Sequence, residues 1–182
     1  MKNFIFTVLA LILGACCKEG KQSNSYILSS DEHAFIPYVA NESIRFKHSN
    51  RFEFDVKVKS RETKVSKTDV RHCGDNYSFF ETLTVELIST NPELSINLSV
   101  VPNAYRSSLM IMINNYSFFL NTMSKPDFDT LVINQKSFYN IYNIQSTGSD
   151  TLTISPKQVL YSKAVGIIQI TMTNNEQFTI NQ

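Results

Sequence analysis

Hydrophobic and polar residues alternate with a period of two along most of the chain after residue 25. The clearest run, residues 51–59, places Phe52, Phe54, Val56 and Val58 on one face and charged residues on the other. Because successive side chains of a strand point to opposite faces, this run predicts a half-buried β-strand. The same pattern recurs at residues 43–47, 82–87, 95–100 and 168–172.

Residues 109–113 form a solid apolar run, of the kind found in strands that are covered on both faces. Turn signals separate these runs, at residues 69–76, 91–92, 102–103, 114–115, 125–127 and 147–149. Many short strands at this spacing predict an all-β fold. We expect an antiparallel meander of roughly eight to ten strands that forms a sandwich or a partly open barrel.

Two segments near the C-terminus need separate interpretation. Ser155 and Pro156 could start a helix, but the residues that follow favour β-structure, so a strand is predicted there. The final hairpin is expected to join residues 168–173 to residues 176–180 through Asn174 and Asn175, because Asn tolerates the positive φ angles of a tight turn.

The first 15 residues have the organisation of a secretory signal. Lys2 gives a positive start, and residues 4–13 form an uncharged apolar stretch. A membrane-spanning helix needs about 20 apolar residues, so this segment predicts a processing signal and not a membrane anchor.

The sequence Leu13-Gly14-Ala15-Cys16 resembles the bacterial lipobox. The resemblance implies that a diacylglycerol is attached to Cys16 and that a signal peptidase cleaves between Ala15 and Cys16. An ordinary signal peptide with a chance cysteine is the alternative. Several acyl chains hold a protein stably on a membrane without a transmembrane helix.

Residues 16–25 are expected to form a lipidated N-terminus and a flexible tether, followed by a single β-domain at residues 26–182. Nine flexible residues span about 16 Å on average, so the domain would lie close to the membrane. Since Cys17 is not the Asp that retains lipoproteins at the inner membrane of enteric bacteria, the outer membrane is predicted. Lys18-Glu19 is similar to the surface signals of some Bacteroidota lipoproteins, which leaves the periplasmic face and the cell surface both open.

Two segments of the C-terminal half carry a second resemblance. Residues 131–142 end in Phe138-Tyr139-Asn140-Ile141-Tyr142, and residues 161–168 read Tyr-Ser-Lys-Ala-Val-Gly-Ile-Ile. Together with the final hairpin they are similar to uncharacterised Bacteroidota lipoproteins. Those proteins usually have Trp in the last strand, where this chain has Phe178, and Gly in the first turn. The resemblance implies β architecture and no known activity.

Charge and cysteine content limit the classes of partner and the disulfide bonds that we expect. The 182 residues include 17 basic and 16 acidic ones, and loss of the signal removes Lys2, so the mature domain is neutral. A nucleic-acid partner is therefore not expected, because binding to phosphates needs a basic surplus. Cys17 and Cys73 could pair in an oxidising compartment, but we expect a free Cys73, because such a bridge would pull the domain against the bilayer.

Candidate chemistry is sparse. Residues 69–75 include His72 and Cys73, but neighbours in a strand point to opposite faces, so a polar turn is favoured over a metal site or a thiol nucleophile. His33 and His48 are expected to be isolated in polar loops. Serine-hydrolase and phosphate-binding motifs are missing from the sequence. Three carboxylate pairs are interpreted as solvated faces of strands and turns: Glu53 with Asp55, Glu81 with Glu86, and Asp127 with Asp129. No metal, cofactor or catalytic residue is predicted.

Aromatic residues gather in three patches, for which core packing is the main expectation and a lining for a lipid or a sugar ring the alternative. The patches are Tyr77, Phe79 and Phe80; Tyr116, Phe118 and Phe119; and Phe138, Tyr139 and Tyr142. Asp129-Thr130-Leu131 and Asp150-Thr151-Leu152 resemble the O-glycosylation motif of Bacteroidota, which makes Thr130 and Thr151 candidate attachment sites.

These features predict a non-enzymatic binding or accessory module held by lipid at the outer membrane, with other outer-membrane proteins or a hydrophobic ligand as partner. A carrier that holds a lipid or another hydrophobic ligand in a pocket of the β-sheet is the alternative. A hydrolase with two carboxylates is a third hypothesis, which requires an open cleft with facing acidic side chains.

Overall fold

The computed structural model describes residues 20–68, 76–102, 107–148 and 153–181. This part of the chain is almost entirely β-structure, so the prediction of an all-β antiparallel fold is confirmed. The elements are β1 (Gln22–Tyr26), α2 (Ser30–His33), β2 (Ser43–His48), β3 (Glu53–Lys67), β4 (Tyr77–Thr90), β5 (Glu93–Val101), β6 (Ser108–Ile113), β7 (Tyr116–Asn121), β8 (Phe128–Ile133), β9 (Lys136–Gln145), β10 (Pro156–Ser162), β11 (Gly166–Met172) and β12 (Gln177–Ile180).

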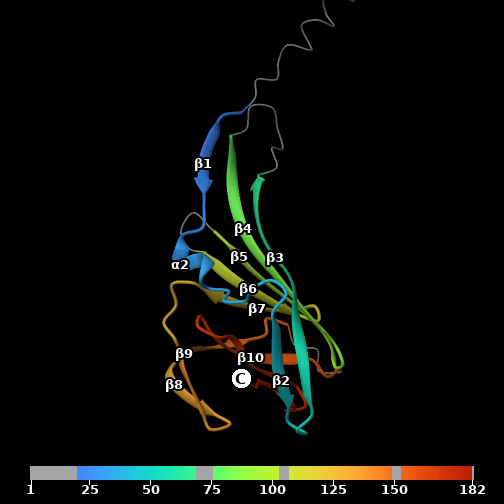
Figure 1. The fold of residues 1–182 in the computed structure, drawn as a ribbon. Helices are drawn as coiled ribbons and strands as arrows, with labels where there is room; N and C mark the ends of the chain where they lie inside the picture. The colour runs from blue at the N-terminus through green and yellow to red at the C-terminus, as the bar shows by residue number, and fades with distance from the viewer. Residues whose placement is uncertain (1–19, 69–75, 103–106, 149–152, 182) are drawn as a thin grey trace, which may run out of the picture.

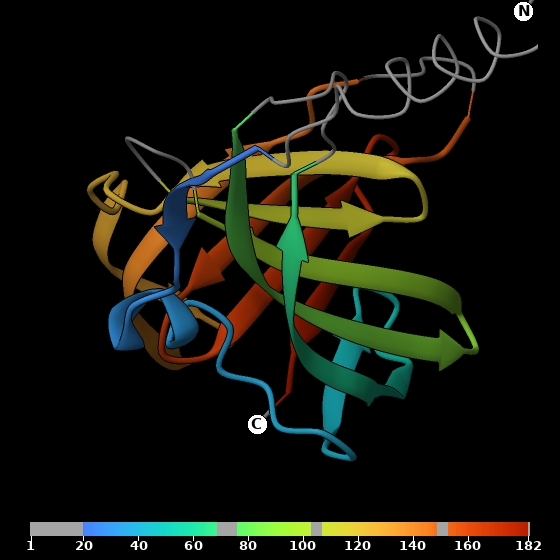
Figure 2. The same cartoon turned by 90° about the horizontal axis from the view of Figure 1, so that it is seen from above.

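The strands form one 12-stranded sheet with the order β7-β6-β5-β4-β3-β2-β12-β11-β10-β9-β8, and β1 pairs in parallel with β4 beside this path. The sheet curls into a half-barrel (Figures 1 and 2). Its two ends meet at one point, where Phe118 bridges to Ser146 and the backbone N–H of Thr147 donates to the carbonyl of Ser117 at 3.0 Å. A single curled sheet therefore encloses the core.

The core consists of the inward-facing residues of these strands. In β3, Phe54, Val56 and Val58 are buried as the alternation predicts, but Phe52 lies before the strand and is 47% exposed. In β6, Leu109, Ile111 and Ile113 are buried and the methionines between them are only half-buried. This run is therefore fully covered on one face and only partly covered on the other, where the sequence predicted cover on both.

The two C-terminal predictions agree with the structure. Residues 156–162 form strand β10 and not a helix. Strands β11 and β12 pair as an antiparallel hairpin, in which the Asn175 N–H donates to the carbonyl of Met172 at 3.0 Å. Only Asn175 has a positive φ, of 69°. The loop is therefore a turn followed by one left-handed residue, and not a tight turn made by both asparagines.

Residues 27–40, which we call the plug, cross the core side of the sheet from β3 to β10 and β11. Leu28, Phe35, Ile36 and Tyr38 of the plug are buried in the main core. The plug contains α2, a single turn that the sequence analysis missed. Its signal is present, since Ser29 and Glu32 form a capping box at the helix start.

Strand β1 occupies residues that the sequence analysis assigned to the tether. Its side chains are mostly exposed, so no hydrophobic alternation marks it, and it forms through backbone pairing with the start of β4. The structured domain therefore begins by Gln22, and the predicted tether is shorter by at least four residues.

The turn between β8 and β9 has a backbone conformation that can be tested by mutation. Asn134 and Gln135 both have positive φ, 51° and 67°, as a type I′ turn requires. Glycine adopts this conformation without the steric penalty of a side chain, so Gln135→Gly should raise the free energy of unfolding by about 0.5 kcal/mol. Urea denaturation measures the change. Gln145→Gly, at the exposed end of β9, is the control and should destabilise the domain.

Candidate functional site

A surface hollow of about 310 Å³ lies between β9 and the loop that joins β10 to β11. We call it the aromatic hollow. Its volume is at the lower end of the range of small-molecule sites, about 300–1,000 Å³. It is lined by Pro126, Ser137, Phe138, Tyr139, Asn140, Tyr142, Ser162, Lys163, Ala164 and Val165.

Strand pairing explains why these distant segments meet. β9 and β10 are antiparallel neighbours, with Tyr142 opposite Tyr161 and Ile141 opposite Ser162. The loop at residues 163–165 then turns back beside β9. The two C-terminal segments that carry the resemblance to Bacteroidota lipoproteins therefore supply all the lining of the hollow except Pro126.

Two tyrosines give the hollow its chemistry. Tyr139 is 61% exposed, so one face of its ring is available to a ligand. Tyr142 is buried, and this burial together with the carboxylate of Asp127 raises the pKa of its phenol. A tyrosine phenol is protonated at neutral pH, and this shift extends the pH range over which the Tyr142 hydroxyl can donate a hydrogen bond.

Asn140 adds a local backbone constraint. It lies within β9 with a φ of 53°, a left-handed conformation that is uncommon for any residue except glycine and unusual inside a strand. Such conformations cost free energy and are concentrated at ligand sites. The strained residue lies in the wall of the hollow.

Lys163 connects the hollow to the plug. Its ammonium group lies 3.8 Å from the centre of the Phe35 ring, which is a cation–π distance. The lysine is thereby held against the plug. The polar groups left to contact a ligand are then the Ser137 hydroxyl, the Asn140 amide and the tyrosine hydroxyls, because the Ser162 hydroxyl is buried.

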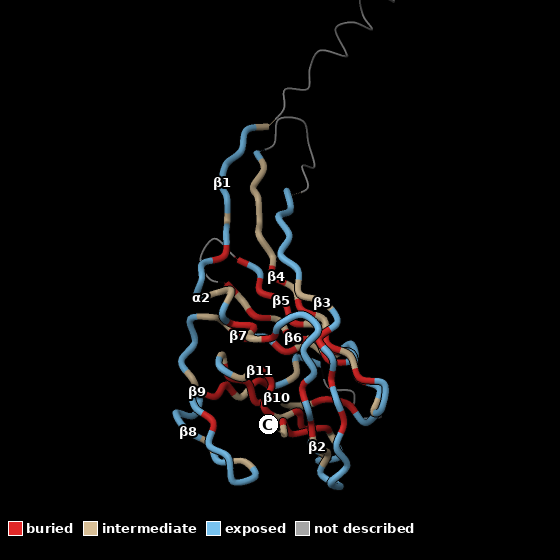
Figure 3. The backbone as a smooth tube through the Cα atoms, viewed as in Figure 1, coloured by how far each residue is buried: buried red, intermediate tan, exposed pale blue. Residues whose placement is uncertain are grey.

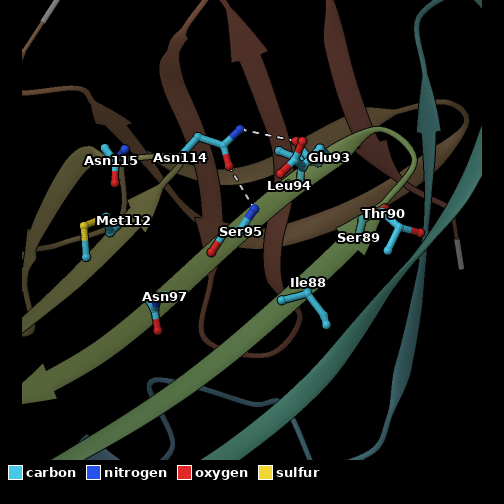
Figure 4. A pocket seen from close by; sticks show the side chains of 10 residues that line it. All are labelled: Ile88, Ser89, Thr90, Glu93, Leu94, Ser95, Asn97, Met112, Asn114 and Asn115. Atoms are coloured by element: carbon cyan, nitrogen blue, oxygen red, sulfur yellow. Dashed lines mark hydrogen bonds between the residues drawn. The ribbon is translucent and has the colours of Figure 1, made fainter.

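A second, larger hollow of about 630 Å³ lies where the β4–β5 and β6–β7 hairpins end (Figure 4). Its most prominent polar group is already engaged, since the Asn114 amide accepts from the Ser95 N–H at 2.8 Å and donates to the Glu93 carbonyl at 3.4 Å. Its lining has no aromatic residue: Ile88, Ser89, Thr90, Glu93, Leu94, Ser95, Asn97, Met112, Asn114 and Asn115. We therefore regard the aromatic hollow as the better candidate despite its smaller volume.

One of the residues predicted for modification lies beside this site. Thr130 is exposed on β8 and pairs with Tyr139 of β9, so a group attached to Thr130 would stand next to the hollow. The other predicted site residues, Ala15, Cys16 and Thr151, lie outside the described residues, as do Cys17, His72 and Cys73.

Both histidines differ from the prediction that they are isolated in polar loops. His33 belongs to α2, and its Nε2 lies 3.5 Å from a carboxylate oxygen of Glu81. His48 ends β2, and its Nε2 lies 3.7 Å from Glu176. Glu81 is also not solvated as predicted. Its side chain is only 13% exposed and accepts from the backbone N–H of Leu28 at 2.9 Å.

The remaining carboxylates predicted to be solvated are distributed over the surface. Glu53, Asp55, Asp127 and Asp129 are exposed, and Glu86 pairs with Lys59 at 2.9 Å. Neither hollow is lined by two carboxylates. Among the described residues, no group of three or more His, Cys, Asp and Glu side chains is placed to hold a metal ion.

The three aromatic patches have three different environments. Phe118 is fully buried while its neighbour Phe119 is 52% exposed. Phe138 and Tyr142 are buried beside the exposed Tyr139. The residues of the first patch are only half-buried and lie outside the main core. Core packing thus accounts for part of the second and third patches and for none of the first.

No family model, curated protein or solved structure matches this chain. The resemblance to Bacteroidota lipoproteins therefore stays a prediction from the sequence. In the described part of the chain, no helix has the length and hydrophobicity needed to cross a membrane.

Proposed function

We propose that this protein is a lipid-anchored, non-enzymatic binding module of the outer membrane, and that its aromatic hollow binds a sugar ring of a saccharide. The lipobox supports lipid attachment at Cys16, and the presence of Cys17 in place of an inner-membrane retention Asp supports the outer-membrane location. Either face of that membrane agrees with the proposal.

The meeting of the two C-terminal segments at the hollow is the observation that carries the binding role. An exposed tyrosine ring, a strained asparagine and an exposed serine hydroxyl surround it. Aromatic rings offer an apolar face to the C–H groups of a sugar, while amide and hydroxyl groups bond to its hydroxyls. The hollow also lies away from the end at which the N-terminal segment leaves the domain, since the β8–β9 hairpin and the start of β1 are at opposite ends of Figure 1.

The interior of the half-barrel counts against the alternative of a hydrophobic carrier. Large side chains such as Phe46, Phe118 and Tyr161 are almost completely buried in it. Such a core leaves little room for a lipid chain. Native mass spectrometry of protein purified from its host would support the carrier instead if a hydrophobic molecule is retained.

Binding to a printed panel of neutral and acidic oligosaccharides tests the proposed ligand class. Labelled protein should bind some of these saccharides, and Tyr139→Ala should weaken that binding about tenfold because the stacking surface is lost. Val132→Ala is the matched control, since Val132 is 64% exposed on the adjacent β8 and does not line the hollow. Equal binding by both variants would contradict the assignment of the hollow.

Labelling of host cells with radioactive palmitate tests the anchor. The wild-type chain should incorporate label and fractionate with membranes. Cys16→Ala removes the thiol that would accept lipid, so this variant should carry no label and keep its N-terminal segment. Cys17→Ala is the neighbouring control and should be labelled normally. Label retained by Cys16→Ala would exclude Cys16 as the lipid acceptor.

A further inference from the structure

A three-stranded ribbon projects from the half-barrel beyond the end of the core (Figure 1). It consists of β1, residues 64–67 at the end of β3 and residues 77–81 at the start of β4. We call it the arm. Figure 3 shows that it is exposed or half-buried along its length, whereas the buried residues are concentrated in the body below it. A ribbon of this kind has no core of its own.

Four aromatic rings lie on the arm, two on each face. Tyr26 and Phe80 stack at 4.8 Å between ring centroids, and Tyr77 and Phe79 pack edge to face at 5.6 Å. All four residues are only half-buried. Val65, 54% exposed, adds to the apolar surface. Exposed aromatic residues gathered on one projection indicate a contact that the isolated chain does not satisfy.

Lysines accompany these rings. Lys21, Lys64 and Lys67 are exposed on the arm, and the Lys67 ammonium lies 3.7 Å from the centre of the Tyr77 ring. In the described part of the chain none of these three lysines forms an ion pair. Aromatic rings beside lysines are typical of protein surfaces at the membrane–water interface, where the lysines attract anionic headgroups.

The path of the chain identifies the surface that the arm meets. The described chain enters the domain at the tip of the arm, directly before β1 (Figure 1). Cys16 precedes Gln22 by six residues, which span at most about 20 Å. Acyl chains on Cys16 would therefore enter the membrane within that distance of Gln22, which pairs with Tyr77. Tyr26 and Phe80 lie three to four residues further from the tip, about 10–13 Å.

We propose that the tip of the arm contacts the headgroup region of the membrane that holds the lipid anchor. This inference rests on the proposed lipid attachment at Cys16. The arm then gives the domain a fixed orientation and directs the aromatic hollow away from the bilayer. The lysines at the end of β3 oppose addition of a further strand at that edge of the arm.

The absence of tryptophan from the chain provides a direct test. Phe79→Trp places a single reporter on the arm, and Phe52→Trp places one beside the other end of β3, about 50 Å along the strand. Mature protein purified from host membranes is incorporated into vesicles of phosphatidylethanolamine and phosphatidylglycerol, with and without brominated acyl chains. We expect the tryptophan fluorescence of Phe79→Trp to lie at shorter wavelength than that of Phe52→Trp and to lose at least half its intensity with brominated lipid. The fluorescence of Phe52→Trp should change little with brominated lipid.

The outcomes separate the two proposals. Protein that does not float with the vesicles contradicts both lipid attachment and the membrane contact. Protein that floats while Phe79→Trp is quenched no more than Phe52→Trp contradicts the membrane contact alone. A blue shift of Phe79→Trp without quenching also overturns it, because the ring is then covered by protein. Tyr77→Trp, on the same face, is a second reporter if Phe79→Trp does not fold.

Discussion

Replacement of Gly166 by alanine is expected to lower the free energy of unfolding by about 3 kcal/mol, a large part of the stability of a typical domain. Gly166 starts β11 with a φ of +86°. A side chain in a left-handed conformation costs about 1–2 kcal/mol. A β-carbon at this position would also lie 2.8 Å from Cε1 of the Tyr38 ring, and closer still to Cζ and Oη.

The Tyr38 ring cannot move away freely. It is buried, and its hydroxyl oxygen accepts a hydrogen bond from the Ile167 N–H at 2.6 Å. Displacement of the ring by the new methyl group would break this bond and disturb the packing of the plug, which adds about 1–3 kcal/mol. The cost of the left-handed backbone and the cost of displacing the Tyr38 ring together give the expected loss of about 3 kcal/mol in the free energy of unfolding.

Urea denaturation measures this effect as a fall in the midpoint of about 1.5 M. Gly148→Ala is the control, because a β-carbon there has no atom within 4 Å and no positive φ is found. Tyr38→Leu shortens the side chain that the methyl group meets, so Gly166→Ala should cost less in that background. An equal cost in both backgrounds would assign the effect to the backbone alone.

The same region shows what the sequence could predict and what it could not. The regular alternation of Phe54, Val56 and Val58 specifies a half-buried strand whatever it pairs with, so the first half of β3 follows from the sequence. The second half, which continues to Lys67, was not predicted. The plug has no such period, because its buried residues fill the space inside a curved sheet. Its position depends on contacts with strands far away in the sequence.

A β-bulge in β3 places one charged residue, Arg61, where the alternation of the strand would not. The pairing with β4 shifts by one residue between Val58 and Ser60, which moves the following odd-numbered residues of β3 to the core face. Arg61 therefore lies opposite the buried Val85. From the alternation alone Arg61 belongs to the solvated face, and nothing local to the sequence marks the bulge. Glu81 is a different case, because it lies on the same face of β4 as the buried Leu83, so its low exposure agrees with the alternation.

The aromatic hollow was predictable only in part. Phe138, Tyr139 and Tyr142 form a patch that is visible in the sequence, and residues 161–168 stand out separately through their resemblance to Bacteroidota lipoproteins. Only the pairing of β9 with β10 brings this patch and residues 161–168 together. The positive φ of Asn140 is likewise a tertiary property, since asparagine tolerates this conformation but does not require it.

Replacement of Arg61 by methionine should destabilise the protein by about 3 kcal/mol and loosen the plug first. The Arg61 guanidinium donates to the carbonyls of Ile36 at 2.7 Å, Tyr38 at 2.9 Å and His33 at 3.4 Å. A hydrogen bond to a charged group contributes about 1.5–3 kcal/mol. The three bonds here share one partly exposed guanidinium and are not additive, so the loss is expected at the upper end of that range. Methionine keeps most of the apolar stem, so the loss reports the guanidinium itself.

Arg45→Met is the matched control for this prediction. Arg45 lies on β2, its side chain is 57% exposed, and it pairs with the exposed Asp55 at 3.1 Å. Surface ion pairs contribute little to stability, so Arg45→Met should leave the urea midpoint nearly unchanged. The urea midpoint of Arg61→Lys should lie between those of Arg61→Met and Arg45→Met. Lysine keeps the charge but has no planar group that can donate to several carbonyls at once.

Hydrogen exchange distinguishes loosening of the plug from a uniform loss of stability. The amide of Ile167 is protected by Tyr38, and the amide of Leu28 by Glu81. If Arg61 fastens the plug to β3, both amides should exchange faster in Arg61→Met while core amides such as that of Val85 stay protected, because the plug can then open without unfolding of the sheet. Equal acceleration at all three positions would mean that the plug and the half-barrel unfold as one unit. The guanidinium would then stabilise the whole fold, and not the plug in particular.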